Sequence, residues 1–190
     1  MDKNKSATRC AIIECALTLL QEKGYNGWSY EDISKCVGIR KATIHYYFPK
    51  KEDLGKELIV EYSKNTMAFL DLPENKDKSP RDKLLVIIDL FASVLDNPNM
   101  FCLCGMLAAD LPTLAPGITL ELTDYFNKIE TRVQQIFEAG EREKLWTCTQ
   151  SASFEASSLI AAFQGMLLLS RMRGGKSHFI KMAQNYISKI

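Results

Sequence analysis

The stretch that decides the fold is residues 29–54, which read SYEDISKCVGIRKATIHYYFPKKEDL. It begins with Ser29 and has an acid, Asp32, three residues later, which is the pattern of a capping box at a helix start. Gly38 follows about two turns on and allows the positive backbone φ of a tight turn. A second short helix fits residues 40–48, before a proline ends it. Two short helices joined by a tight turn predict a helix-turn-helix.

The apolar residues of this stretch are spaced to hold the two short helices at a steep angle, so that the second helix presents a polar face. That face consists of Arg40, Lys41, Thr43, His45 and Tyr46. One α-helix fits the DNA major groove, where arginine and lysine donate to guanine and threonine contacts thymine or phosphate. The residues alone therefore favour DNA binding, with a merely solvated helix face as the alternative.

Apolar residues recur at helical spacing along nearly the whole chain. We expect further helices over about residues 6–23, 50–70, 80–95, 100–111, 116–139, 151–173 and 176–190, with a polar loop at 73–78. No segment alternates like a strand bounded by hairpin turns. The sequence predicts an all-α fold. We expect two domains. Residues 1–47 form a three-helix domain that contains the helix-turn-helix. Residues 48–190 form the second domain, which begins with a connecting helix at 48–70 and continues as a helical bundle.

Composition is that of a soluble globular chain: 190 residues, 46% hydrophobic and 25% charged, with a net charge of +1. Residues 1–56 hold ten Lys or Arg and seven Asp or Glu, so the basic end is where a polyanion is expected. We expect no secretory signal, no apolar run of bilayer length and no membrane partner, and hence a cytoplasmic protein. The six cysteines lack a CxxC pair and are expected as free thiols, with no metal and no cofactor.

An enzyme is the competing class, and it needs a nucleophile beside a base or paired carboxylates in a pocket. His45 and His178 have no evident partner, and Glu141 and Glu143 stand in a charged stretch that is expected to be exposed. We assign no catalytic residue and do not expect an enzyme. A protein-interaction scaffold is the third class. An enzyme and a scaffold alike are expected to show no salt-dependent affinity for DNA.

The chain also resembles a known family. The matching residues are Gly24-Tyr25, Ser29-x-x-Asp32-Ile33-Ser34, Val37-Gly38-Ile39, Ala42-Thr43-Ile44-His45-Tyr46-Tyr47-Phe48 and Lys51-x-x-Leu54. In order and spacing they resemble the N-terminal signature of the tetracycline-repressor family. Two positions depart from that signature: His45 stands where a tyrosine is usual, and Arg40 where a small capping serine is usual.

The resemblance implies a role for each matched position. Ser29, Tyr47 and Lys51 would contact phosphates, whereas Lys41, Ala42, Thr43, His45 and Tyr46 would contact bases or the groove wall. The predicted DNA-contacting set also includes Tyr30 and Arg40. The resemblance further implies a homodimer on a near-palindromic double-stranded operator, and a repressor released by a small apolar or electrophilic effector. The bundle would then be the effector-binding and dimerisation domain.

Dimerisation has a separate argument, because residues 154–170 are apolar around most of the helix and such a helix must be covered on all sides. We expect a homodimer through the helices of residues 151–190, with Phe163 and Leu167 at the contact; the alternative is burial within one subunit. The candidate effector-binding residues are Phe91, Cys102, Cys104, Met106, Tyr125, Phe126 and Phe163. Either cysteine is a candidate sensor thiol, and plain core packing is the alternative for all seven. The helix of residues 50–70 is expected to be the only link between effector site and helix-turn-helix.

Overall fold

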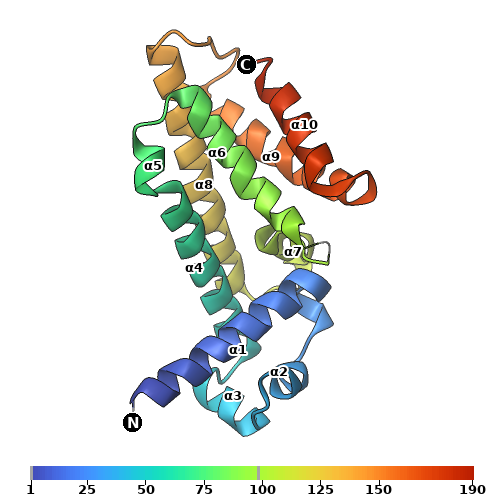
Figure 1. The fold of residues 1–190 in the computed structure, drawn as a ribbon. Coiled ribbons are helices and arrows are strands. Elements are labelled where there is room, and N and C mark those ends of the chain that lie inside the picture. Colours follow the sequence, from blue (N-terminus) through green and yellow to red (C-terminus); the bar gives the residue numbers. More distant parts are fainter. Residues whose placement is uncertain (1, 98) are drawn as a thin grey trace. The chain divides into compact units, whose positions relative to one another are not determined.

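The computed structural model describes residues 2–97 and 99–190, and over these residues the chain is helical with no strand. The predicted all-α fold with an N-terminal helix-turn-helix is confirmed (Figure 1). The helices are α1 Asp2–Lys23, α2 Tyr30–Val37, α3 Lys41–Tyr47, α4 Lys51–Leu70, α5 Pro73–Lys76, α6 Pro80–Ser93, α7 Leu103–Ala109, α8 Pro116–Arg142, α9 Ala152–Met172 and α10 Gly175–Ile187. Single 3₁₀ turns lie at η1 Tyr25–Gly27, η2 Val94–Asp96 and η3 Leu111–Thr113.

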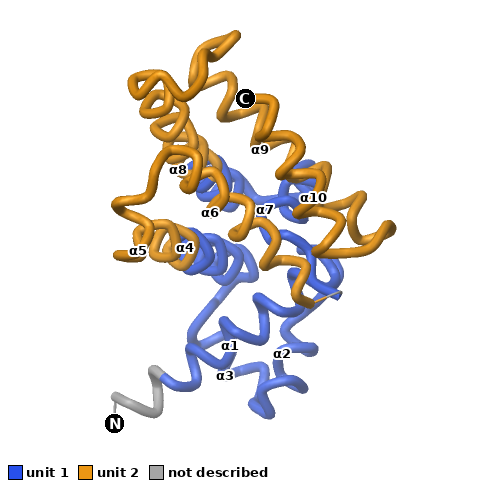
Figure 2. The backbone as a smooth tube through the Cα atoms, turned by 45° about the horizontal axis from the view of Figure 1, so that its top comes forward, with its two compact units in different colours: residues 1–63, 99–125 blue, residues 64–98, 126–190 orange. Residues whose placement is uncertain are grey.

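The chain forms two compact units, each made of two segments (Figure 2). Unit 1 consists of residues 1–63 and 99–125, and unit 2 of residues 64–98 and 126–190. Helices α4 and α8 each begin in unit 1 and end in unit 2. Unit 1 thus contains α7 as well as the helix-turn-helix. The predicted boundary at residue 47, between a three-helix domain and a helical bundle, stays a prediction.

Unit 1 is built around the apolar faces of α1 to α4. Ile12, Ala16 and Leu20 of α1 are fully buried and lie at helical spacing. They share this core with the apolar residues of the helix-turn-helix and the start of α4: Ile33, Ile44, Leu54 and Leu58. Burial of each such side chain stabilises the fold by about 1.5–3 kcal/mol. This core fixes α2 and α3, whose remaining faces carry the polar residues.

A second set of contacts in unit 1 joins the N-terminal helices to the segment around α7. The Phe101 N–H donates to the Gln21 carbonyl at 2.9 Å, and the Gln21 amide donates back to the Phe101 carbonyl at 3.2 Å. The Tyr25 N–H donates to the Asp110 carboxylate at 2.8 Å. The expectation that α4 is the only link to the helix-turn-helix is therefore wrong, because residues about 80 positions apart in the chain meet here.

Unit 2 has an aromatic core centred on Phe163 of α9, which is fully buried. Its ring lies edge-on to Phe91 of α6 at 5.4 Å and to Phe179 of α10 at 5.6 Å between centroids. Leu167 of the same helix is only 3% exposed. The expectation that Phe163 and Leu167 form a contact between subunits is wrong, because α6 and α10 of the same chain already cover them.

The opposite face of α9 is apolar and uncovered. Phe154 and Leu168 are each 59% exposed, and Met172 is 75% exposed. By length and composition α9 is the one helix among the described residues that reaches the requirement for a membrane span. The expectation that no apolar run approaches that length is therefore wrong. A second expectation also fails, since α5 lies where a loop was expected at 73–78.

Candidate nucleic-acid interface

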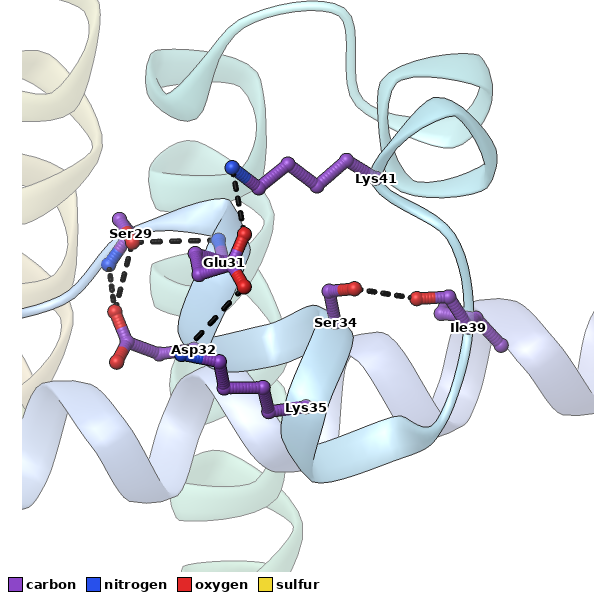
Figure 3. Close-up of polar contacts among 7 residues, drawn as sticks. All are labelled: Ser29, Glu31, Asp32, Ser34, Lys35, Ile39 and Lys41. Carbon is purple, nitrogen blue, oxygen red and sulfur yellow. Dashed lines mark hydrogen bonds and ion pairs between the residues drawn. The ribbon is translucent and has the colours of Figure 1, made fainter.

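Helix α2 starts at the predicted capping box (Figure 3). The Ser29 hydroxyl oxygen accepts from the Glu31 N–H at 3.2 Å and donates to the Asp32 carboxylate at 2.8 Å. The same carboxylate accepts from the Ser29 N–H at 2.8 Å. These bonds hold the pKa of Asp32 below its usual value. They satisfy N–H groups that would otherwise be orphans at the helix start, so the start of α2 is fixed.

The turn between α2 and α3 depends on Gly38, whose φ of 73° and ψ of 31° lie in the left-handed region. Ser34 completes this turn: its hydroxyl donates to the Ile39 carbonyl at 2.6 Å, and its own carbonyl accepts from the Gly38 N–H at 3.0 Å. The sequence argument gave Ser34 no role of its own. Its position four residues before the glycine was the available signal, because serine side chains commonly bond to nearby backbone groups.

Helix α3 turns one apolar residue inward and a polar face outward. Ile44 is fully buried and anchors the helix. The exposed side chains are Arg40, Lys41, Ala42, His45 and Tyr46, whereas Thr43 and Tyr47 are half-buried. The structure thus gathers the predicted groove-facing residues on one short helix. Tyr46 is 66% exposed and packs edge-on against Tyr47, with 5.2 Å between their ring centroids.

Glu31 of α2 pairs with two lysines on the same surface (Figure 3). Its carboxylate lies 2.7 Å from the ammonium of Lys41 and 3.5 Å from that of Lys35. The hydrogen bond and charge of Lys41, and then Lys35, hold the pKa of Glu31 below its usual value. Both lysines are more than half exposed. A DNA group that approaches Lys41 therefore competes with Glu31 for its ammonium.

Two residues of the predicted set pack against each other: Tyr30 is buried, whereas His45 is exposed. Tyr30 is 9% exposed and its hydroxyl donates to the Phe48 carbonyl at 2.8 Å. Burial, followed by the charge of Asp53, raises the pKa of Tyr30 to about 12. The ring of His45 packs against Tyr30 at 4.8 Å, and its Nδ1 lies 3.3 Å from the Pro49 carbonyl. Tyr30 therefore packs the helix-turn-helix, and we leave it out of the proposed DNA-contacting set.

Lys51, at the start of α4, is engaged within the chain. Its ammonium donates to the carbonyls of Tyr25 at 2.6 Å and Trp28 at 2.5 Å. It also lies over both rings, 4.7 Å and 4.1 Å from their centroids. Burial lowers the pKa of Lys51. In this structure Lys51 ties α4 to the turn before α2, and a phosphate contact would have to replace these bonds.

The predicted effector-binding residues fall into both units. In unit 1, Cys102 Sγ lies 4.0 Å from the Tyr62 hydroxyl, whose ring is 5.6 Å from that of Tyr125. Cys104 is fully buried, and burial raises the pKa of its thiol, which disfavours the reactive thiolate. Met106 lies beside Gly24. The structure gathers these residues into the packing of unit 1.

In unit 2, Phe91 and Phe163 are core residues and Phe126 is half-buried. Unit 2 also contains a cavity of about 270 Å³ between the end of α4, α5, α6 and α8. The lining of this cavity includes none of the seven predicted effector-binding residues. Helical spacing could not find it, because its walls come from four separate elements.

Comparisons with known proteins agree with this geometry. Residues 12–58 match the model of the family described as bacterial regulatory proteins, tetR family. The biofilm operon icaADBC HTH-type negative transcriptional regulator IcaR of Staphylococcus epidermidis is 44% identical over 120 residues. The aligned part is 63% of this chain and 62% of that relative, so the match spans less than two thirds of the relative's length.

Two solved structures are similar over nearly their whole length. A TetR family transcriptional regulator from Agrobacterium tumefaciens has a TM-score of 0.92 at 29% identity, and covers 98% of this chain and 99% of that one. A TetR transcriptional regulator from Legionella pneumophila has a TM-score of 0.84 at 29% identity, and covers 94% of each chain. The arrangement of helices in these regulators is thus the arrangement found here.

Proposed function

Because this chain belongs to the tetR family of bacterial regulatory proteins, we propose that it is a sequence-specific DNA-binding transcriptional repressor. One observation carries the proposal. A capping box, a glycine turn and the buried Ile44 fix α3, so that Arg40, Lys41, Thr43 and Tyr46 stand on one outer surface. The relative from S. epidermidis is named a negative regulator, which supports repression over activation.

In this proposal α3 enters the major groove and reads bases through Lys41, Ala42 and Thr43. Arg40 and Tyr46 contact the groove wall, and His45 contributes only if its ring leaves Tyr30. Ser29 and Tyr47 contact phosphates, and Lys51 does so only by exchanging its two carbonyl partners. Phosphate contacts set the position of the helix, whereas base contacts set sequence preference.

The exposed face of α9 supports a homodimer. Two copies joined through α9 cover their uncovered apolar residues, Phe154, Leu168 and Met172, and become related by a two-fold axis. A symmetric dimer presents two α3 helices to successive major grooves, so its operator is a near-palindrome. Insertion of α9 into a bilayer is the rival explanation of the same residues. We favour the dimer, because α9 contacts α6 and α10 along its other face.

Regulation by a small effector is the finer part of the proposal. An effector releases the operator only if it binds one arrangement of the repressor better than the other. If the effector reacts with a cysteine thiol, Cys102 is the better candidate for the sensor. Cys102 is half-buried beside Tyr62, whereas Cys104 is fully buried. A cytoplasmic location follows from the same proposal, because the operator is there.

Selection from random DNA tests the proposal. The purified chain is mixed with a random duplex library, bound duplexes are recovered over several rounds, and their sequences are compared. We expect a shared near-palindrome with half-sites about one helical turn apart. The Lys41→Ala chain should select a relaxed sequence, whereas Lys181→Ala on α10 should select the parent's sequence. Recovery of duplexes with no shared sequence would contradict the proposal.

A further inference from the structure

The cavity in unit 2 has an apolar floor. Val86 and Ile87 of α6 and Ile136 of α8 line it, and all three are buried. Its volume of about 270 Å³ lies just below the range of drug-sized ligand pockets, which begins at about 300 Å³. A ligand that fills this cavity is therefore small and has an apolar part that rests on the three side chains.

The rim of the same cavity is basic. Lys76 of α5, Lys83 of α6 and Arg132 of α8 line it, and Asp71 is the single acid among the lining residues. Arg132 is paired with Asp71 at 2.7 Å. Lys76 and Lys83 make no ion pair with any described residue. Two ammonium groups thus stand at the mouth of an apolar cavity without a counter-charge, which favours an anionic ligand.

We propose that this cavity binds a small amphipathic anion, such as a carboxylate with a short apolar chain, and that this anion is the repressor's effector. The apolar chain lies on Val86, Ile87 and Ile136, and the carboxylate accepts hydrogen bonds from Lys83 and Arg132. The identification as effector rests on the proposed function, whereas the binding itself does not.

Asp71 connects the proposed anion site to α4. The residue follows the last turn of α4, and its pair with Arg132 ties this end of the helix to α8. A ligand carboxylate competes with Asp71 for Arg132 and loosens that tie. The other end of α4 begins at Lys51, which holds the turn before α2. The proposed ligand thus acts at one end of α4, and the other end of α4 contacts the turn that precedes the helix-turn-helix.

Isothermal titration calorimetry on the full chain tests the binding. The probes are octanoate, 1-octanol, which has the same chain without the charge, and inorganic phosphate, which has charge without the chain. We expect octanoate to bind one per chain, and the other two at least about tenfold more weakly, since each lacks one half of the recognition. No octanoate binding, or equal affinity for octanol, would overturn the proposal.

Two substitutions with opposite expected effects on octanoate affinity distinguish binding in this cavity from binding elsewhere. Lys83→Gln should weaken octanoate binding by about tenfold, because a charged hydrogen-bond donor is lost. Asp71→Asn should strengthen it, because the competing anion is removed and Arg132 is released. Lys181→Gln on α10 is the matched control and should leave it unchanged. A gain of affinity cannot arise from misfolding, so equal affinity in Asp71→Asn and the parent overturns the proposal.

DNA binding in the presence of octanoate tests the effector role separately. Octanoate should weaken operator binding by the parent and do so less for Lys83→Gln at the same concentration. Binding of octanoate without any loss of operator affinity overturns the effector role. If the ligand-free chain binds no DNA at all, it is the proposed function that fails, and the calorimetry still decides whether the cavity takes the anion.

Discussion

Glu31 pairs with two lysines of the proposed DNA-facing surface in the unbound chain, and so limits their availability to DNA. Its carboxylate lies 2.7 Å from the ammonium of Lys41 and 3.5 Å from that of Lys35. Exposed ion pairs of this kind contribute little to stability. Glu31 instead competes for Lys41 with any DNA group that approaches this lysine.

Replacing Glu31 with glutamine should therefore strengthen DNA binding. Loss of the Glu31 charge frees Lys41 for a base and lets Lys35 neutralise about one more phosphate, so affinity should rise for both operator and random DNA and fall more steeply with salt. Fluorescence anisotropy over a range of salt concentrations measures both quantities. Glu143→Gln, a control in unit 2, should show the DNA affinity and salt dependence of the parent. Unchanged or reduced affinity in Glu31→Gln would show that Lys41 does not face DNA.

Lys51 has a packing role that the sequence did not predict, and a stability measurement tests it. Lys51→Met leaves the carbonyls of Tyr25 and Trp28 without their donor, which should lower the free energy of unfolding by about 1–3 kcal/mol. Urea unfolding followed by circular dichroism measures this loss. A chain of unchanged stability whose DNA affinity and salt dependence both drop would instead make Lys51 a phosphate contact.

Asp32 gives the helix-turn-helix a defined response to acid. Its bonds to Ser29 hold its pKa below the usual 3.8, so the folded state favours the charged carboxylate. A lowered pKa contributes stability that is present above the unfolded pKa and lost as pH falls through the folded one. The stability advantage of the parent over Asp32→Asn should be constant at neutral pH and shrink below about pH 4. A difference that does not change with pH would contradict this.

At the scale of elements, the proposed homodimer depends on α9. One face carries the buried Phe163 and Leu167, and the other carries residues 154, 161, 165, 168 and 172, which follow each other at helical spacing. Small residues at 161 and 165 let a second helix approach closely. Because both faces are apolar, the sequence alone could not say which one packs inside the subunit.

Leu168→Glu should convert the dimer to a monomer, because it places a charge in the middle of the uncovered face. Analytical ultracentrifugation measures the mass in solution, and circular dichroism checks that the helices remain. Leu120→Glu on α8 is the control, since Leu120 is also exposed, at 71%, and should leave the dimer intact. A monomeric parent that partitions into lipid vesicles would point to the bilayer in place of the second subunit.

The elements also show what local sequence can and cannot predict. The capping box at Ser29 and the turn at Gly38 were predictable, because each depends on residues within a few positions of one another. Helix α5 was missed because four residues carry no helical periodicity. The bonds of Lys51 to Trp28, and of Tyr25 to Asp110, could not be predicted, since they join residues that only the folded chain brings together.

At the scale of the whole molecule, the helix-turn-helix is held by more than α4. The turn of residues 24–28 bonds to Lys51 on one side and to Asp110 on the other. Within unit 1, a change in the segment around α7 therefore reaches α1 and the turn before α2 without passing along α4. In the proposed repressor, a bound effector would have two routes by which to shift the balance between the two arrangements.

Specificity for one DNA sequence is the central claim, and a salt-controlled comparison of two duplexes tests it most directly. The affinity of the chain for the selected near-palindrome is measured beside a scrambled duplex of the same composition, for the parent and for Thr43→Ala. The account predicts operator binding at least about 10³ times tighter, with both affinities falling as salt rises. It also predicts that Thr43→Ala loses about 1–3 kcal/mol on the operator alone. Equal affinity of the parent for both duplexes at every salt concentration would contradict the account.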